Sequence, residues 1–138
     1  EQLMSVKYVP FYELIKTSDI ISLHCPLTEE TKGLLGKEEL STMKSSAIII
    51  NVARGEIIDE NALADALKEG RIAGAALDVF SDEPINSNNP LLKVDNDRLL
   101  LTPHVAGVSI ESQIRIINLT IENIIAVISG REPVNIIV

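Results

Sequence analysis

Short runs of apolar residues alternate with segments of helical periodicity along this chain. Nearly every position in these runs is apolar, whereas a half-buried strand would show an apolar residue at every second position. Continuous apolar runs are typical of parallel β-strands that helices cover on both faces. The pattern therefore predicts strands over residues 6–9, 20–25, 47–53, 74–80 and 99–102.

The segments between these runs have the spacing of amphipathic helices and are predicted over 11–17, 37–44 and 60–69. The last has the clearest boundaries, because Asp59 can cap its first turn and Gly70 can end it in a left-handed conformation. Strands and helices in alternation predict an α/β fold with right-handed crossovers.

The last third of the chain differs from this alternation. Residues 81–98 are rich in Asp, Asn, Ser and Pro and predict a long ordered loop with a short apolar turn at 91–92, and loops of this length are usually functional. Ser109 then caps a predicted helix that ends at Gly130 and has isoleucines on a broad face. We expect this helix to be covered on more than one side, and to be followed by a strand over 134–138.

Composition narrows the class of protein. With 138 residues, 46% of them hydrophobic, the chain can bury a sizeable core. The net charge of −8 disfavours a polyanion such as nucleic acid as a partner. The lone Cys25 suits a reducing cytoplasm, and no signal peptide or long uncharged apolar run indicates export or a membrane.

Three residues of catalytic type each follow a buried apolar run: Arg54, Glu83 and His104. A guanidinium, a carboxylate and an imidazole together can bind a 2-oxo acid and protonate its carbonyl oxygen. Each also has an ordinary structural interpretation. Arg54 could pair with a nearby Asp59 or Glu60, Glu83 could be a solvated charge, and His104 could simply end a strand.

Other candidate residues are weaker or are excluded. Asp78 interrupts an apolar strand, so its carboxylate needs a polar partner or a ligand. Cys25 has no activating base nearby and fits a core position better than a catalytic one. Two histidines and one cysteine, far apart in the sequence, do not form a metal site.

The order and spacing of several short motifs give the most specific signal. They are His24-Cys-Pro26-Leu-Thr28, Asn51-Val-Ala-Arg54-Gly55, Asp59-Glu-Asn-Ala-Leu63, Ala75-Ala-Leu-Asp78-Val79, Asp82-Glu83-Pro84 and Thr102-Pro-His104. Together they resemble the D-isomer-specific 2-hydroxyacid dehydrogenases, which include phosphoglycerate, glycerate and D-lactate dehydrogenases. The resemblance runs through almost the whole chain and implies an NAD-dependent enzyme, most similar to the phosphoglycerate and glycerate/hydroxypyruvate types. It also implies that the sheet is the second half of a Rossmann-type parallel sheet, with flanking helices and a long C-terminal crossover helix.

The resemblance also implies roles. Arg54 would bind the carboxylate and carbonyl oxygen of the substrate, His104 would be the acid/base, and Glu83 would hold and orient the imidazolium. Asp78 would accept a hydrogen bond from the nicotinamide carboxamide. Further cofactor contacts would come from Cys25, Pro26, Val52, Ala53, Ala106 and Gly107.

The sequence departs from the family in having no Gly-x-Gly-x-x-Gly segment. We therefore expect the chain to be part of a longer dehydrogenase, called the parent protein below, and to be inactive by itself. Residues 1–107 would form part of the NAD-binding domain, and 108–138 would belong to or contact the substrate domain. NAD is the expected cofactor, with NADP not excluded, and the expected partners are a small 2-hydroxy or 2-oxo acid and a second subunit in a homodimer.

Two other classes of function stay open at this point. A corepressor of the same family would use the fold as a nucleotide-sensitive binding platform and would keep Arg54, Glu83 and His104. A purely structural piece would serve only assembly. Turnover of a 2-oxo acid by the parent protein would separate an enzyme from both.

Overall fold

The computed structural model describes residues 6–136, which divide into two compact units with their boundary between His104 and Val105. The first unit holds a parallel β-sheet and its helices, and the second holds one long helix and the segment after it. Each unit is described separately below.

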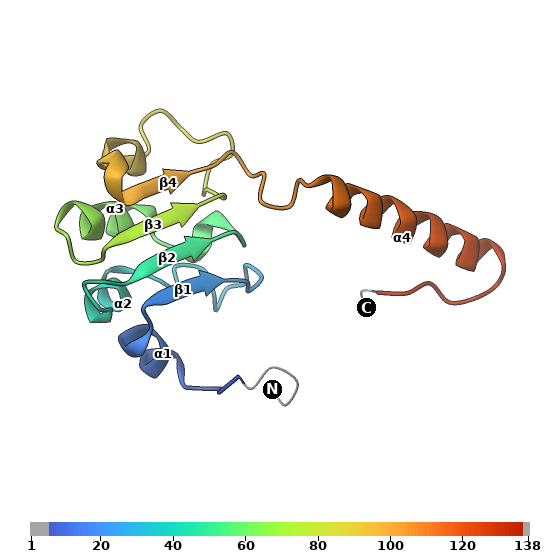
Figure 1. Ribbon diagram of the computed structural model, residues 1–138, viewed down its shortest axis with the longest axis horizontal. Coiled ribbons are helices and arrows are strands. Elements are labelled where there is room, and N and C mark those ends of the chain that lie inside the picture. Colours follow the sequence, from blue (N-terminus) through green and yellow to red (C-terminus); the bar gives the residue numbers. More distant parts are fainter. Residues whose placement is uncertain (1–5, 137–138) are drawn as a thin grey trace. The chain divides into compact units, whose positions relative to one another are not determined.

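The sheet of the first unit has the strand order β1-β2-β3-β4, and every neighbouring pair is parallel. The arrows in Figure 1 accordingly all point the same way. The strands are β1 (Ile20–Leu23), β2 (Ile48–Asn51), β3 (Gly74–Leu77) and β4 (Leu99–Leu101). The α/β fold with a parallel, Rossmann-type sheet is confirmed, and the carboxyl ends of all these strands lie along one edge.

The helix α1 (Phe11–Thr17) precedes β1, α2 (Lys37–Thr42) connects β1 to β2, and α3 (Glu60–Lys68) connects β2 to β3. Local signals set the ends of α3, as predicted: Oδ1 of Asp59 accepts hydrogen bonds from the N–H groups of Asn61 and Ala62, and Gly70 is left-handed with φ +68°. Buried side chains of α3 such as Leu63 and Leu67 join Ile49 and Leu77 of the sheet in one hydrophobic core.

The predicted strand over 6–9 is wrong. Val6 and Tyr8 are exposed, at 57% and 84%, and this segment is not paired with any strand of the described sheet. Apolar composition alone does not make a strand, because a strand needs a neighbour to satisfy its backbone N–H and C=O groups. The other predicted strands exist but are shorter, since their outer residues have no ladder partners.

Within residues 6–104, one face of the sheet is covered and the other is not, whereas the sequence predicted cover on both faces. On the uncovered side, Ile20, Ile48 and Leu100 are 61%, 40% and 62% exposed. With Ser22, Ile50 and Ala76 they form what we call the outer sheet face. The strands have the apolar residues that a second layer requires, but residues 6–104 do not provide that layer.

The loop predicted over 81–98 contains two 3₁₀ helices, η2 (Pro90–Lys93) and η3 (Asn96–Arg98). The apolar turn predicted at 91–92 is the centre of η2, where Leu91 is buried in the main core. Asn89 caps η2, because its Oδ1 accepts a hydrogen bond from the N–H of Leu91 at 3.0 Å. The loop is therefore anchored to the core in its middle.

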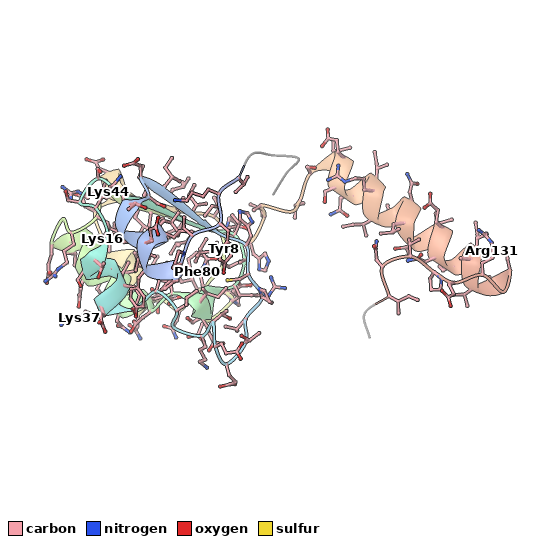
Figure 2. All side chains as sticks on the ribbon, turned by 90° about the horizontal axis from the view of Figure 1, so that it is seen from below. Tyr8, Lys16, Lys37, Lys44, Phe80 and Arg131 are labelled. Atoms are coloured by element: carbon pink, nitrogen blue, oxygen red, sulfur yellow. The ribbon has the colours of Figure 1, made fainter. Side chains whose placement is uncertain are left out.

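The second unit contains α4 (Ile110–Ile128), which Ser109 caps by accepting a hydrogen bond from the N–H of Ser112 and which ends before Gly130 at φ +71°. Both boundaries were predicted. Figure 2 shows side chains projecting from this helix on both sides. Among the residues of α4, only Ala126 is buried, and the other described residues of the second unit do not supply the cover that the sequence predicted.

The closing strand predicted over 134–138 is absent from its described part, 134–136, and residues 137–138 lie outside the described residues. The side chain of Asn123 satisfies the backbone groups of Val134. Its Oδ1 accepts a hydrogen bond from the N–H of Val134 at 2.9 Å, and its Nδ2 donates to the carbonyl of Val134 at 3.2 Å. A side-chain amide of α4 thus replaces the strand neighbour that a β-ladder would need.

We expect the 138-residue chain to self-associate in solution, because the outer sheet face is an exposed apolar patch and such patches mark interaction surfaces. Replacing Ile20 and Leu100 with lysine should shift sedimentation toward the monomer, since a charge on the outer sheet face opposes pairing. Asn88→Lys adds the same charge on the exposed loop and is the control. A wild-type chain that sediments as a monomer at high concentration would contradict the expectation.

Candidate active site

The candidate site lies at the carboxyl edge of the sheet, where β2, β3 and β4 give way to loops. Ligands in open α/β sheets bind at this edge. Asp78 directly follows β3 and is 3% exposed, and its Oδ1 accepts a hydrogen bond from the Thr102 hydroxyl at 2.5 Å. Thr102 itself follows β4 and donates its backbone N–H to Leu77 at 2.9 Å. The buried carboxylate is thus held by the neighbouring strand end.

Asn51, the last residue of β2, shapes the loop that carries Arg54. It is 1% exposed; its Nδ2 donates to the carbonyl of Arg54 at 2.8 Å, and its Oδ1 accepts from the N–H of Ala53 at 3.0 Å. Because the buried amide pairs with two neighbouring residues of this short loop, it restricts the conformations of the loop. The position of Arg54 is therefore determined by a core residue.

His104 and Glu83 come together from loops that follow different strands. Nδ1 of His104 and Oε2 of Glu83 are 2.7 Å apart, and the side chains are 52% and 38% exposed. His104 has a φ of 55°, which is uncommon for a residue other than glycine and is concentrated at functional sites. The structure therefore forms the pair that the sequence analysis expected of these two residues.

The charge of Glu83 is stabilised by several partners. The hydrogen bond with His104, followed by one from the N–H of Phe80 to Oε1 at 3.0 Å, holds the pKa of the Glu83 carboxyl below its ordinary value. The positive charge of Arg54 lowers this pKa further and is the smallest contribution. Glu83 is therefore a carboxylate at neutral pH, and the negative charge strengthens its hydrogen bond with the imidazole.

Arg54 is exposed, and its Nη1 donates to the carbonyl of Ala53 at 2.6 Å. The two carboxylates considered as its structural partners are engaged elsewhere. Asp59 caps α3, and Glu60 accepts hydrogen bonds from Ser81 and Asn89. The guanidinium of Arg54 is close enough to Glu83 to act on its charge, and it remains accessible to a ligand.

A pocket of about 440 Å³ adjoins the Glu83–His104 pair. Apolar side chains make up most of its wall, and they favour burial of part of a ligand beside the two charged groups. The lining residues are Phe80, Glu83, Pro84, Ile85, Pro103 and His104.

The remaining predicted site residues fall into two groups. Cys25 and Pro26 follow β1, and Val52 and Ala53 follow β2, so these four lie at the carboxyl edge of the sheet. Cys25 is half-buried and packs against the core. Ala106 and Gly107 belong to the second unit, between His104 and α4, and the structure does not place that unit relative to the edge.

The sequence analysis gave no role to Asn51, Thr102 or Gly55, all of which shape the site. A signal for Asn51 was available, because a polar residue that ends an Ile-Ile-Ile run must pair inside the core. Gly55 had none: a Cβ on it would lie 1.9 Å from the carbonyl carbon of Phe80, and only the folded chain brings these backbones together.

The donors and acceptors at this edge suit a nicotinamide ring. The buried Asp78 carboxylate is an acceptor, which matches the N–H donors of a carboxamide. Among residues 6–136, no three His, Cys, Asp or Glu side chains lie close enough together to hold a metal ion. Over the same range, no helix is both long and apolar enough to cross a membrane.

Comparison with known proteins is consistent with a nicotinamide-binding edge. The family profile described as D-isomer specific 2-hydroxyacid dehydrogenase, NAD binding domain, matches residues 1–106. A glyoxylate reductase from Korarchaeum cryptofilum is 47% identical over 99% of this chain and 41% of its own length. A hydroxypyruvate reductase from Blautia hydrogenotrophica is 43% identical over 95% of this chain and 40% of its own length.

Among solved structures, a D-isomer-specific 2-hydroxyacid dehydrogenase from Lactobacillus delbrueckii ssp. bulgaricus, in an NAD-complexed form, superposes with a TM-score of 0.85 at 32% identity. The match covers 95% of this chain and 43% of that one. The chain thus spans less than half the length of each of these proteins.

Proposed function

This chain belongs to the D-isomer-specific 2-hydroxyacid dehydrogenase family, and on that basis we propose that the parent protein transfers a hydride between NAD(H) and a 2-hydroxy/2-oxo acid. The observation that carries this proposal is the hydrogen bond of 2.7 Å between Nδ1 of His104 and Oε2 of Glu83, at the edge of the sheet that also holds the buried Asp78. An imidazole that a carboxylate orients can protonate a carbonyl oxygen during its reduction.

The roles of the chain's own residues follow from this geometry. Glu83 occupies Nδ1 of His104, so Nε2 is the nitrogen that can transfer a proton to the substrate carbonyl oxygen during reduction and remove it during oxidation. Arg54 binds the substrate carboxylate through its planar fork of N–H donors, which also orients the 2-carbon. The ionised Glu83 stabilises the imidazolium before the proton is transferred.

Bound NAD(H) supplies or accepts the hydride. Asp78 would hold the nicotinamide carboxamide, with Thr102 fixing its orientation, and Val52 and Ala53 would line the same edge. Cys25 and Pro26 would lie toward the adenosine side, and Ala106 and Gly107 would complete the site. NADP remains an alternative cofactor.

The remaining assignments belong to the same proposal. The parent protein would act as a cytoplasmic homodimer without a nucleic-acid partner, in line with the lone Cys25 and the net charge of −8. Residues 1–107 would contribute to NAD binding, and 108–138 to the substrate domain.

The proposal is tested by assaying the purified parent protein with NADH and NADPH against glyoxylate, hydroxypyruvate and 3-phosphohydroxypyruvate. We expect reduction of at least one of these acids, and strong dependence on Arg54. No turnover with any acid and either cofactor would reject the enzyme assignment and favour a binding role.

Arg54→Lys should weaken binding of the 2-oxo acid by about 1.5 to 3 kcal/mol, the scale of hydrogen bonds to charged groups. Lysine keeps the charge but loses the planar pair of donors. Cofactor affinity, measured by NADH fluorescence, should stay nearly the same. Equal losses for substrate and cofactor would show that Arg54 acts on the structure of the loop instead.

A further inference from the structure

The carboxylate of Glu60 has no part in the proposed chemistry, yet it holds both ends of the loop that carries Glu83. Its Oε1 accepts a hydrogen bond from the backbone N–H of Ser81 at 2.7 Å, and its Oε2 accepts one from Nδ2 of Asn89 at 2.6 Å. Glu60 is the first residue of α3, so a packed helix anchors both contacts. One side chain thus closes residues 81–89, called the Glu83 loop below.

The far end of the Glu83 loop is tied to the core through Asn89. This side chain is 7% exposed, and the residue that its Oδ1 caps, Leu91, is 1% exposed. The donor of the hydrogen bond from Asn89 to Glu60 is therefore buried, and the carboxylate charge strengthens this partly buried bond. Loss of the carboxylate would leave the amide of Asn89 buried without this acceptor.

The near end of the loop has adjacent backbone N–H groups that donate to different carboxylates. The backbone N–H of Phe80 donates to Glu83 at 3.0 Å, and the backbone N–H of Ser81, the next residue, donates to Glu60 at 2.7 Å. The same peptide unit lies against Gly55, next to Arg54. Glu60 therefore fixes the backbone from which the Glu83 side chain reaches His104, and keeps it against the loop of Arg54.

We propose that Glu60 is a positioning residue for the reaction, which keeps Glu83 hydrogen-bonded to His104 by holding Ser81 and Asn89. Its catalytic consequence rests on the proposed function, whereas its effect on the Glu83–His104 hydrogen bond needs no turnover. Without Glu60, the loop keeps its backbone length but loses the contacts that select one conformation. Glu83 then spends less time in the orientation that pairs with His104.

The test uses Glu60→Ala in the parent protein, with ¹⁵N-histidine NMR to follow the Nδ1–H of His104. We expect the hydrogen-bonded Nδ1–H signal of the wild type to move toward its position in Glu83→Gln. With turnover, kcat should fall roughly 10- to 100-fold, the scale of a misplaced catalytic group, while the Kd for NADH changes less than about twofold. In a protein that already carries Glu83→Gln, adding Glu60→Ala should lower kcat further by less than about twofold, because both substitutions act on one interaction.

Glu69→Gln is the matched control, because Glu69 lies at the other end of α3 and pairs on the surface with Arg71. It should leave the His104 signal and kcat unchanged. If Glu60→Ala does not fold, Glu60→Gln carries the test, since it keeps one acceptor oxygen and should give a smaller change in the same direction. An unchanged His104 signal in a folded Glu60 variant, or a fully additive loss with Glu83→Gln, overturns the proposal. A wild-type protein without turnover rejects the proposed function alone, because the NMR result still decides the role of Glu60.

Discussion

Gly55→Ala is expected to lower the free energy of unfolding of the parent protein by about 3 kcal/mol or more, beyond the usual cost of an overpacked core. A Cβ at this position would lie 1.9 Å from the carbonyl carbon of Phe80, 2.2 Å from its oxygen and 2.4 Å from the nitrogen of Ser81. All three are backbone atoms, so a side chain cannot rotate away to make room. The loops of Arg54 and Glu83 would have to separate.

Denaturant unfolding of the wild type and the variant measures this change. Gly36→Ala is the control, because a Cβ there would meet the carboxylate oxygen of Glu39 at 3.3 Å, the end of a flexible side chain and not backbone, and should cost no more than about 1 kcal/mol. Gly55→Ala should also lower kcat, since the same separation moves Arg54 away from Glu83. A stability within about 1 kcal/mol of the wild type would show that the two backbones are not in contact in the folded protein.

His104→Gln is expected to reduce kcat for 2-oxo acid reduction by roughly 10²- to 10⁴-fold, the usual contribution of a general acid. Glutamine retains a polar side chain of similar reach but cannot deliver a proton. The affinity for NADH should be nearly unchanged, because His104 bonds to Glu83 and is not among the proposed cofactor contacts. Single-turnover kinetics separates the chemical step from product release.

Glu83→Gln tests the same pair through its pH dependence. The wild-type carboxyl has a lowered pKa, so it is ionised at neutral pH and carries the charge that faces His104. Glutamine has no charge to balance a protonated general acid, so the alkaline limb of the kcat/KM profile should move to lower pH. The loss of kcat/KM relative to the wild type should be small in acid and largest above neutral pH. A loss of kcat/KM of equal size at every pH would show that Glu83 has no effect on the proton transfer.

The amino-acid sequence determined the features that depend on neighbours along the chain. Helix boundaries are the clearest case, because Asp59 and Ser109 cap N–H groups within the first turn that follows them, and Gly70 and Gly130 end helices through their own conformation. Continuous apolar runs likewise identified the parallel sheet, since period and composition are local properties.

Strand ends could not be obtained in this way. The segment 6–9 has the composition of a strand but no partner in the described sheet, and the runs around β1 to β4 extend beyond their ladders. A strand exists only where another chain segment satisfies its backbone, and that segment is distant in sequence. The same limit applies to the outer sheet face, whose apolar residues indicated a second layer that residues 6–104 do not supply.

For the candidate site, the sequence alone made Arg54, Glu83 and His104 candidates by residue type and by the motifs they share with the family. It also indicated that Asp78 needs a partner, because a carboxylate is unusual in an apolar strand. Only the tertiary structure decided which of them meet. The Glu83–His104 and Asp78–Thr102 pairs and the backbone contact of Gly55 with Phe80 join segments more than 20 residues apart. Such contacts depend on the register of parallel strands and on the packing of their loops, which arise only when the whole sheet forms around its core.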